Sequence, residues 1–144
     1  QAQGIAVVGT RELAVTQAEC VLLLLTDAAA IRSVLLSPAC AATLKGKTIV
    51  QMGTIGSRES LDLQQEIEQY GGRYCEAPVL GSLAEAKLGT LFVMVGATEN
   101  LFTRIKPLFS SLGREPRLIG PVGKAAGLKL ALNLLIAAET SAFG

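Results

Sequence analysis

Residues 48–76 read TIVQMGTIGSRESLDLQQEIEQYGGRYCE, a strand-like run, a longer segment of helical spacing and a second strand-like run. Thr48–Met52 and Arg73–Glu76 are rich in strand-forming residues. Ser57–Tyr70 between them places its acidic residues on one side, as a helix with a solvent-facing side does, and Gly71 follows where that helix would end. A helix between two strands is the unit from which parallel sheets are built.

The same alternation extends over the rest of the chain. Four further strands are predicted at Ile5–Val8, Val21–Leu25, Leu91–Val95 and Arg117–Ile119. Further helices are predicted at Arg11–Glu19, Ala28–Leu36, Leu83–Lys87, Glu99–Ser111 and from Val122 to the end, with Asp27 and Thr98 as N-caps. The predicted fold is an α/β, Rossmann-like, doubly wound and mostly parallel sheet, partial in extent, that ends in the start of a long helix.

Composition limits the classes of function. The chain has 144 residues, 50% of them hydrophobic, and a net charge of +1, which suits a globular domain and gives no electrostatic footprint for nucleic acid or a membrane surface. No apolar run is long enough to span a membrane. The 3 cysteines are scattered and histidine is absent, so we expect no metal site and a cytoplasmic location.

In α/β sheets, ligands bind beyond the carboxyl ends of the strands, so the segments that follow each strand should be considered together. These segments are Thr26–Asp27, Gly53–Ile55, Ala77–Ser82, Gly96–Thr98 and Gly120–Gly123. Small, hydroxylated and glycine residues predominate in them, which allows a ligand to approach the backbone. Ser82 and Glu85 also form a capping box, and the free N–H groups of the short helix that follows favour an anion such as a carboxylate.

Residues 120–133, GPVGKAAGLKLALN, contain the most informative polar pair. Lys129 and Asn133 are four residues apart in an otherwise apolar helical run, so their side-chain roots lie roughly 5–6 Å apart on one face. Burial among leucines lowers the pKa of a lysine, which would allow Lys129 to donate or accept a proton. A lone lysine in an apolar helix more often extends to solvent, so the pair needs support from the rest of the chain.

That support comes from a resemblance. GPVGKAAGLKLALN resembles the glycine-led, lysine-then-asparagine helix of the β-hydroxyacid dehydrogenases, the family of 3-hydroxyisobutyrate dehydrogenase and the glyoxylate and succinic semialdehyde reductases. EAPVLGS resembles the substrate loop of that family. Three further blocks, LLLLTDAAAIRSVL, VQMGTIGSRES and GTLFVMVGATENLFTRIKPLFSSLGR, match in the same order.

The resemblance implies roles for particular residues. Lys129 matches the catalytic lysine and Asn133 the amide that helps to hold lysine and substrate. Gly81 and Ser82 match the loop that binds the substrate carboxylate. Leu25, Thr26 and Thr54 match positions that line the ribose and nicotinamide of NAD or NADP. The implied substrate is a small carboxylate-bearing aldehyde or hydroxyacid.

Two departures from the family pattern matter. Leu80 occupies the position where serine is common in the substrate loop, which leaves the preferred substrate open. The G-x-G-x-x-G pyrophosphate loop is absent from the sequence. We therefore expect residues 1–120 to be a dinucleotide-binding domain without its first glycine-rich unit, and residues 121–144 to begin a helix leading to a further helical domain. The isolated chain should bind dinucleotide poorly, and the full-length protein should be a homodimer.

Alternatives to this interpretation remain open. Ser82 could be only an N-cap, or both an N-cap and a substrate ligand, and Thr26 and Thr54 could be ordinary strand-end residues. The chain could also be a non-catalytic interaction module on the same scaffold, or part of an imine reductase. The sequence does not choose between NAD and NADP.

Overall fold

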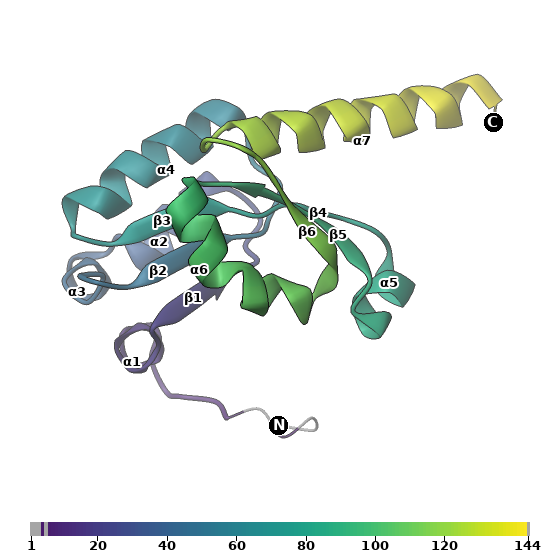
Figure 1. The fold of residues 1–144 in the computed structure, drawn as a ribbon. Helices are drawn as coiled ribbons and strands as arrows, with labels where there is room; N and C mark the ends of the chain where they lie inside the picture. The colour runs from purple at the N-terminus through teal and green to yellow at the C-terminus, as the bar shows by residue number, and fades with distance from the viewer. Residues whose placement is uncertain (1–3, 5, 144) are drawn as a thin grey trace.

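The computed structural model describes residues 4 and 6–143, which form a six-stranded sheet with helices on both faces (Figure 1). The strands are β1 (Cys20–Leu23), β2 (Thr48–Gln51), β3 (Arg73–Glu76), β4 (Val79–Leu80), β5 (Leu91–Gly96) and β6 (Gly113–Gly120). The helices are α1 (Arg11–Gln17), α2 (Ala28–Leu35), α3 (Pro38–Ala41), α4 (Ser57–Gln69), α5 (Leu83–Leu88), α6 (Glu99–Ser110) and α7 (Lys124–Phe143).

The sheet is mostly parallel, as predicted. β1, β2 and β3 pair in parallel and in sequence order, and β6 pairs in parallel with β5. The β5 strand runs antiparallel to β3 and to β4, which continues along β5 beyond the end of β3. The predicted α/β, Rossmann-like fold ending in a long helix is therefore confirmed.

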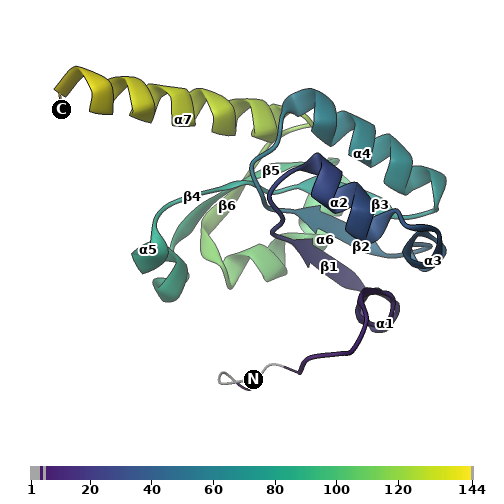
Figure 2. The same ribbon diagram turned by 180° about the vertical axis from the view of Figure 1, so that it is seen from behind.

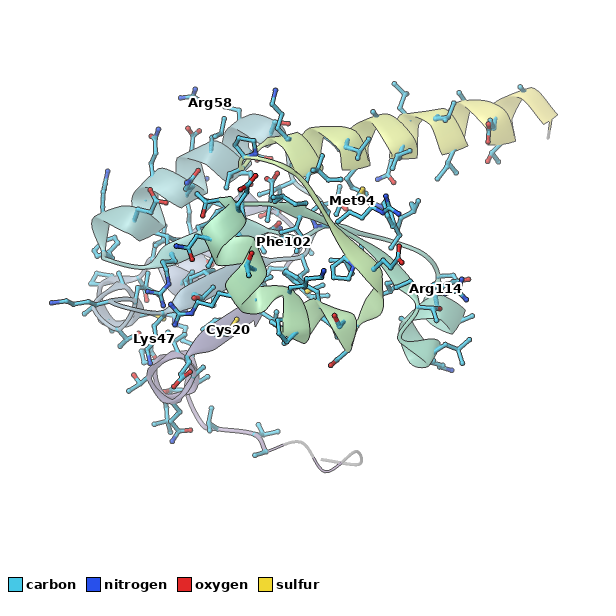
Figure 3. All side chains as sticks on the ribbon, in the orientation of Figure 1. Cys20, Lys47, Arg58, Met94, Phe102 and Arg114 are labelled. Atoms are coloured by element: carbon cyan, nitrogen blue, oxygen red, sulfur yellow. The ribbon has the colours of Figure 1, made fainter. Side chains whose placement is uncertain are left out.

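Successive residues of the central strands point to opposite faces and build two apolar cores. Ile49 and Tyr74 pack on the side covered by α2 and α4, whereas Val50 and Cys75 pack on the side covered by α6. Figures 1 and 2 show α6 on one side of the sheet and α2 on the other, and Figure 3 draws the side chains on the same ribbon, with Phe102 of α6 labelled. Burial of strands on both faces is the arrangement that parallel sheets require.

Local sequence signals set the starts of several helices. Asp27 accepts the N–H of Ala30 at 2.7 Å, and Thr98 accepts the N–H of Leu101 at 3.3 Å. Both N-caps were predicted, and each satisfies one of the backbone donors that the first turn of a helix leaves free. The two caps thus fix where the loops after β1 and β5 end and the next helices, α2 and α6, begin.

The strand predicted at Ile5–Val8 is wrong over the part that is described. Ala6–Val8 form no strand, and the side chain of Val7 is 70% exposed; Ile5 lies outside the described residues. A strand needs a paired neighbour, and β1 pairs only with β2 among the described residues. The short elements α3 and β4 were not predicted, and most other boundaries differ from prediction by one or two residues.

The last helix, α7, is anchored mainly at its start. It begins at Lys124 rather than at Val122, because Gly123 takes a φ of +92°, outside the helical region. Ala125 and Ala126 are buried, while the residues beyond Leu130 are mostly exposed. Figures 1 and 2 show α7 extending from α4 toward the side of the molecule on which α5 lies.

Candidate active site

The residues predicted to line the cofactor lie together where β1 and β2 end. The two strand ends are close, because a Cβ placed on Gly53 would come within 2.7 Å of the carbonyl oxygen of Leu25. Leu25 is half-buried, whereas Thr26 and Thr54 are exposed. The structure thus brings Leu25, Thr26 and Thr54 to one edge of the sheet, with both threonines accessible to a ligand.

The ends of β5 and β6 lie beside the end of β3, because Gly96 is paired with both Glu76 and Gly120, but β5 and β6 reach this point from the opposite direction. Glu76 of β3 lies opposite Gly96 of β5 in antiparallel register, and β6 runs with β5. The segment Gly96–Thr98 therefore runs back along β3, where Thr98 lines a hollow with Tyr74. Only after Gly120–Gly123 does the chain return over the sheet as α7 (Figure 1).

The beginning of α7 lies against the beginning of α4. A Cβ placed on Gly127 would come within 3.0 Å of the Ser57 hydroxyl, and one on Gly123 would come within 3.4 Å of Leu61. The two helices approach closely because neither Gly123, just before α7, nor Gly127 carries a side chain. Ser57 follows Thr54 by three residues, so the contact brings the first turns of α7 beside the loop that ends β2.

Lys129 and Asn133 lie on the face of α7 that begins with the buried Ala125, and burial decreases along it. Ala125, Lys129 and Asn133 are spaced by four residues and share one side of the helix. Ala125 is fully buried, Lys129 is half-buried and Asn133 is exposed. Burial lowers the pKa of Lys129 below the ordinary value of 10.5, as expected for an ammonium group that loses water. Neither side chain makes a hydrogen bond within the described part of the chain.

The predicted substrate loop lies at the turn from β4 into α5. Gly81 has a φ of +140°, which side chains disfavour. The N–H of Ser82 donates to the Glu85 carboxylate at 2.7 Å, and the Ser82 hydroxyl donates to the same oxygen, which confirms the capping box. The hydrogen bond from Ser82 lowers the pKa of Glu85, so this carboxylate is an anion at neutral pH.

The capping box occupies the place at the start of α5 where the sequence suggested that an anion could bind. Glu85 itself supplies a negative charge there, so the chain already satisfies the cap of this short helix. Leu80 is half-buried and lies opposite Phe92 in the β4–β5 pair. No hydrogen bond joins Ser82 to Lys129 within residues 6–143. Substrate binding by Leu80, Gly81 and Ser82 remains a prediction.

One buried charged side chain near these elements was not singled out from the sequence. Glu76, at the end of β3, is completely buried, and its Oε1 accepts the N–H groups of Gly123, Ala125 and Ala126 at 2.8, 2.8 and 3.1 Å. Its Oε2 accepts the hydroxyl of Ser60. A carboxylate at the end of a predicted inner strand was the available signal, because such a group is buried only with partners.

The edge fits part of the dinucleotide that the sequence resemblance implies. Gly53 brings the backbones of two strand ends together, and the exposed hydroxyl groups of Thr26 and Thr54 offer hydrogen bonds to a ribose or an amide. A pyrophosphate needs closely spaced backbone N–H groups such as those of G-x-G-x-x-G, and that pattern is absent from the sequence. The residues present therefore suit the nicotinamide half of the cofactor.

Within residues 4 and 6–143, histidine, cysteine and carboxylate side chains form no group of three or more that could hold a metal ion. The helices in that part of the chain are too short or too polar to cross a membrane.

Comparison with known proteins supports the resemblance. The family described as the NAD binding domain of 6-phosphogluconate dehydrogenase matches residues 1–123. The chain is 41% identical over 101 residues to 2-hydroxy-3-oxopropionate reductase of Escherichia coli, covering 70% of this chain and 35% of that protein. It is 32% identical over 93 residues to the cytokine-like nuclear factor N-PAC of Drosophila melanogaster, covering 65% of this chain and 15% of that protein.

The fold has solved counterparts as well. The structure of 3-hydroxyisobutyrate dehydrogenase from Mycobacterium tuberculosis, with L-serine, superimposes with a TM-score of 0.91 at 24% identity, covering 98% of this chain and 48% of that one. The chain thus spans about a third of the reductase and about half of this dehydrogenase. The chain belongs to the family of the NAD-binding domain of 6-phosphogluconate dehydrogenase and is homologous to the β-hydroxyacid dehydrogenases.

Proposed function

We propose that this chain is part of an NAD(P)-dependent oxidoreductase that interconverts a small β-hydroxyacid and its semialdehyde or keto form. The observation that carries the proposal is the position of Lys129. It is a half-buried lysine with a lowered pKa, on a helix whose start lies against the start of α4, three residues after Thr54. The nicotinamide, when bound, accepts the hydride in oxidation and supplies it in reduction.

Lys129 has the chemistry for proton transfer at the substrate oxygen. In reduction, negative charge develops on the carbonyl oxygen, and the ammonium group of Lys129 donates a proton to it. In oxidation, the neutral amine accepts the hydroxyl proton. Such transfer typically contributes about 10²–10⁴-fold to the rate. Asn133, one turn further along α7, orients the lysine and the substrate.

The remaining site residues bind and orient. Leu25, Thr26 and Thr54 contact the ribose and nicotinamide, and NAD and NADP both remain candidates. Gly81 and Ser82 contact the substrate carboxylate, and the bulk of Leu80 restricts the group beside it. Because Glu85 already engages Ser82, substrate binding would exchange one carboxylate for another at that hydroxyl.

The surface of α7 supports a larger assembly. Leu130, Leu134, Leu135 and Ile136 are between 43% and 72% exposed, which is costly for a helix in water. We infer that a further helical domain and a second copy of the protein cover them in a cytoplasmic homodimer. The free thiols Cys20, Cys40 and Cys75 suit a reducing compartment.

The proposal is tested by Lys129→Ala in the intact protein, with Lys124→Ala as the matched control, since Lys124 is exposed on the same helix. Loss of the proton donor should lower kcat by about 10²–10⁴-fold while leaving nicotinamide binding, followed by fluorescence, nearly unchanged. The Lys124→Ala protein should keep its activity. Near-normal turnover by Lys129→Ala would contradict the proposal.

The match to N-PAC, whose name describes a nuclear factor, favours a second candidate, a non-catalytic interaction module. Cofactor-binding and turnover assays of the unaltered protein distinguish these functions. Oxidation of NADH or NADPH with a semialdehyde supports the dehydrogenase, and preference for an imine would instead indicate an imine reductase. Absence of both cofactor binding and turnover would favour the interaction module.

A further inference from the structure

The buried carboxylate of Glu76 joins the sheet to the first turn of α7. Gly123, just before α7, and Ala125 and Ala126 in its first turn donate their backbone N–H groups to one carboxylate oxygen, at 2.8 to 3.1 Å. The first N–H groups of a helix have no partner within it, and the positive end of the helix dipole favours a negative charge. Glu76 thus acts as the N-cap of α7 from a distant strand.

The surroundings hold this carboxylate in one place. Oε2 accepts the Ser60 hydroxyl, which also lies 3.0 Å from the hydroxyl of Tyr74. Gly96, opposite Glu76 in the sheet, leaves the space that the carboxylate occupies, because a Cβ there would come within 2.3 Å of Oε1. Glu76 is therefore fixed from α4, β3 and β5 at once.

The helix depends on this anchor for its position on the sheet. Ala125 and Ala126 are the buried residues at its start, and burial decreases from Gly127 onward. Lys129 follows Ala126 by three residues, less than one helical turn. Any tilt or shift of the first turn is carried directly to the Lys129 amine.

We propose that Glu76 is a positioning residue for Lys129: its carboxylate fixes the start of α7 so that the lysine reaches the substrate oxygen. This inference rests on the proposed function. A shift of about 1 Å in a reacting group can lower a rate by about 100-fold, so the placement of the helix start affects kcat strongly. Glu76 touches neither the substrate nor the cofactor in this role.

Three substitutions in the intact protein separate geometry from charge. Glu76→Asp keeps the negative charge but is one methylene shorter, so it no longer reaches all three N–H groups. Glu76→Gln keeps the length and one acceptor oxygen. Ser60→Ala is the matched control, because it removes a buried partner of Glu76 and leaves the α7 hydrogen bonds in place.

The expected results follow from the geometry. Glu76→Asp should lower kcat by about tenfold or more, with the cofactor KM unchanged within about twofold. Glu76→Gln should keep kcat within about threefold of the original, and Ser60→Ala should lower the melting temperature while keeping kcat. If Glu76→Gln lowered kcat as much as Glu76→Asp does, the idea that the length of the side chain positions α7 would be contradicted. Should Glu76→Asp not fold, Gly96→Ala displaces the same carboxylate and should lower kcat in the same way.

A double-mutant cycle with Lys129→Ala identifies the residue through which Glu76 acts. In the Lys129→Ala background, measured at high enzyme concentration, Glu76→Asp should cause no further loss in kcat. An equal loss in both backgrounds, or no loss from Glu76→Asp alone, would overturn the inference and leave the role of Lys129 intact. Normal turnover by Lys129→Ala would instead overturn the proposed function and this inference with it.

Discussion

Gly113 is the position where a single methyl group should disturb this fold most. It starts β6 opposite Leu91 of β5, and a Cβ there would lie 2.1 Å from the Leu91 carbonyl oxygen and 2.7 Å from a methyl carbon of Val93. The first contact is with backbone, which cannot rotate away. The start of β6 would have to move by about 1 Å to reach an ordinary contact distance.

The cost follows from the hydrogen bonds lost at that end of the β5–β6 ladder. Each buried backbone group left without a partner costs about 1–3 kcal/mol, so Gly113→Ala should destabilise the protein by about 2–4 kcal/mol. Without the clash, replacing glycine by alanine typically stabilises a protein by about 0.4–1 kcal/mol through the unfolded chain. The sign of the effect is therefore decided by the contact with Leu91.

The assay is thermal unfolding of the intact protein together with hydrogen exchange of the β6 amides. Gly113→Ala should lower the melting temperature by about 5–15 °C and speed exchange at the start of β6. Gly9→Ala is the matched control, since a Cβ there meets nothing within 4 Å, and it should change the melting temperature by no more than a few degrees. An unchanged or raised melting temperature for Gly113→Ala would refute the reasoning.

Two further predictions concern titrating groups. Because reduction requires the protonated amine of Lys129, kcat/KM for reduction should fall as the pH rises through the lowered pKa of this lysine, below the ordinary 10.5, and kcat/KM for oxidation should rise over the same interval. Steady-state rates between neutral and alkaline pH measure both. A titration midpoint above 10.5 in either direction would count against Lys129. The Cys40 and Cys75 side chains are completely buried, and burial raises the pKa of both thiols. A chromogenic disulfide reagent should therefore leave these two cysteines unmodified in the folded protein and react with all 3 cysteines after denaturation. Rapid modification of Cys75 in the native state would show that the β2–β3 core opens readily.

Much of the fold could be predicted because the relevant signals are local. Asp27 and Thr98 cap helices a few residues away, and the capping box of Ser82 and Glu85 spans a single turn. The predicted strand at Arg73–Glu76 matches the observed bounds of β3. The strand at Ile5–Val8 failed over its described part because β-structure depends on a paired neighbour, which the apolar pattern does not supply.

In the candidate site, too, some features could be predicted from the sequence and others could not. The four-residue spacing of Lys129 and Asn133 places them on one helical face whatever the rest of the molecule does. The meeting of Leu25, Thr26 and Thr54 followed from the parallel order of β1 and β2. The reversal of β5 could not be anticipated, since an apolar strand buried on both faces has the same composition in either direction.

The sequence by itself determined the alternation of strands and helices, the caps and the lysine–asparagine face, because each depends on residues within a few positions along the chain. Only the tertiary structure decided that β5 runs antiparallel to β3 and that Glu76 accepts hydrogen bonds from the first turn of α7, some fifty residues later in the chain. A buried carboxylate needs donors from wherever the packed chain provides them. Its partners are therefore set by the fold and not by the neighbouring sequence.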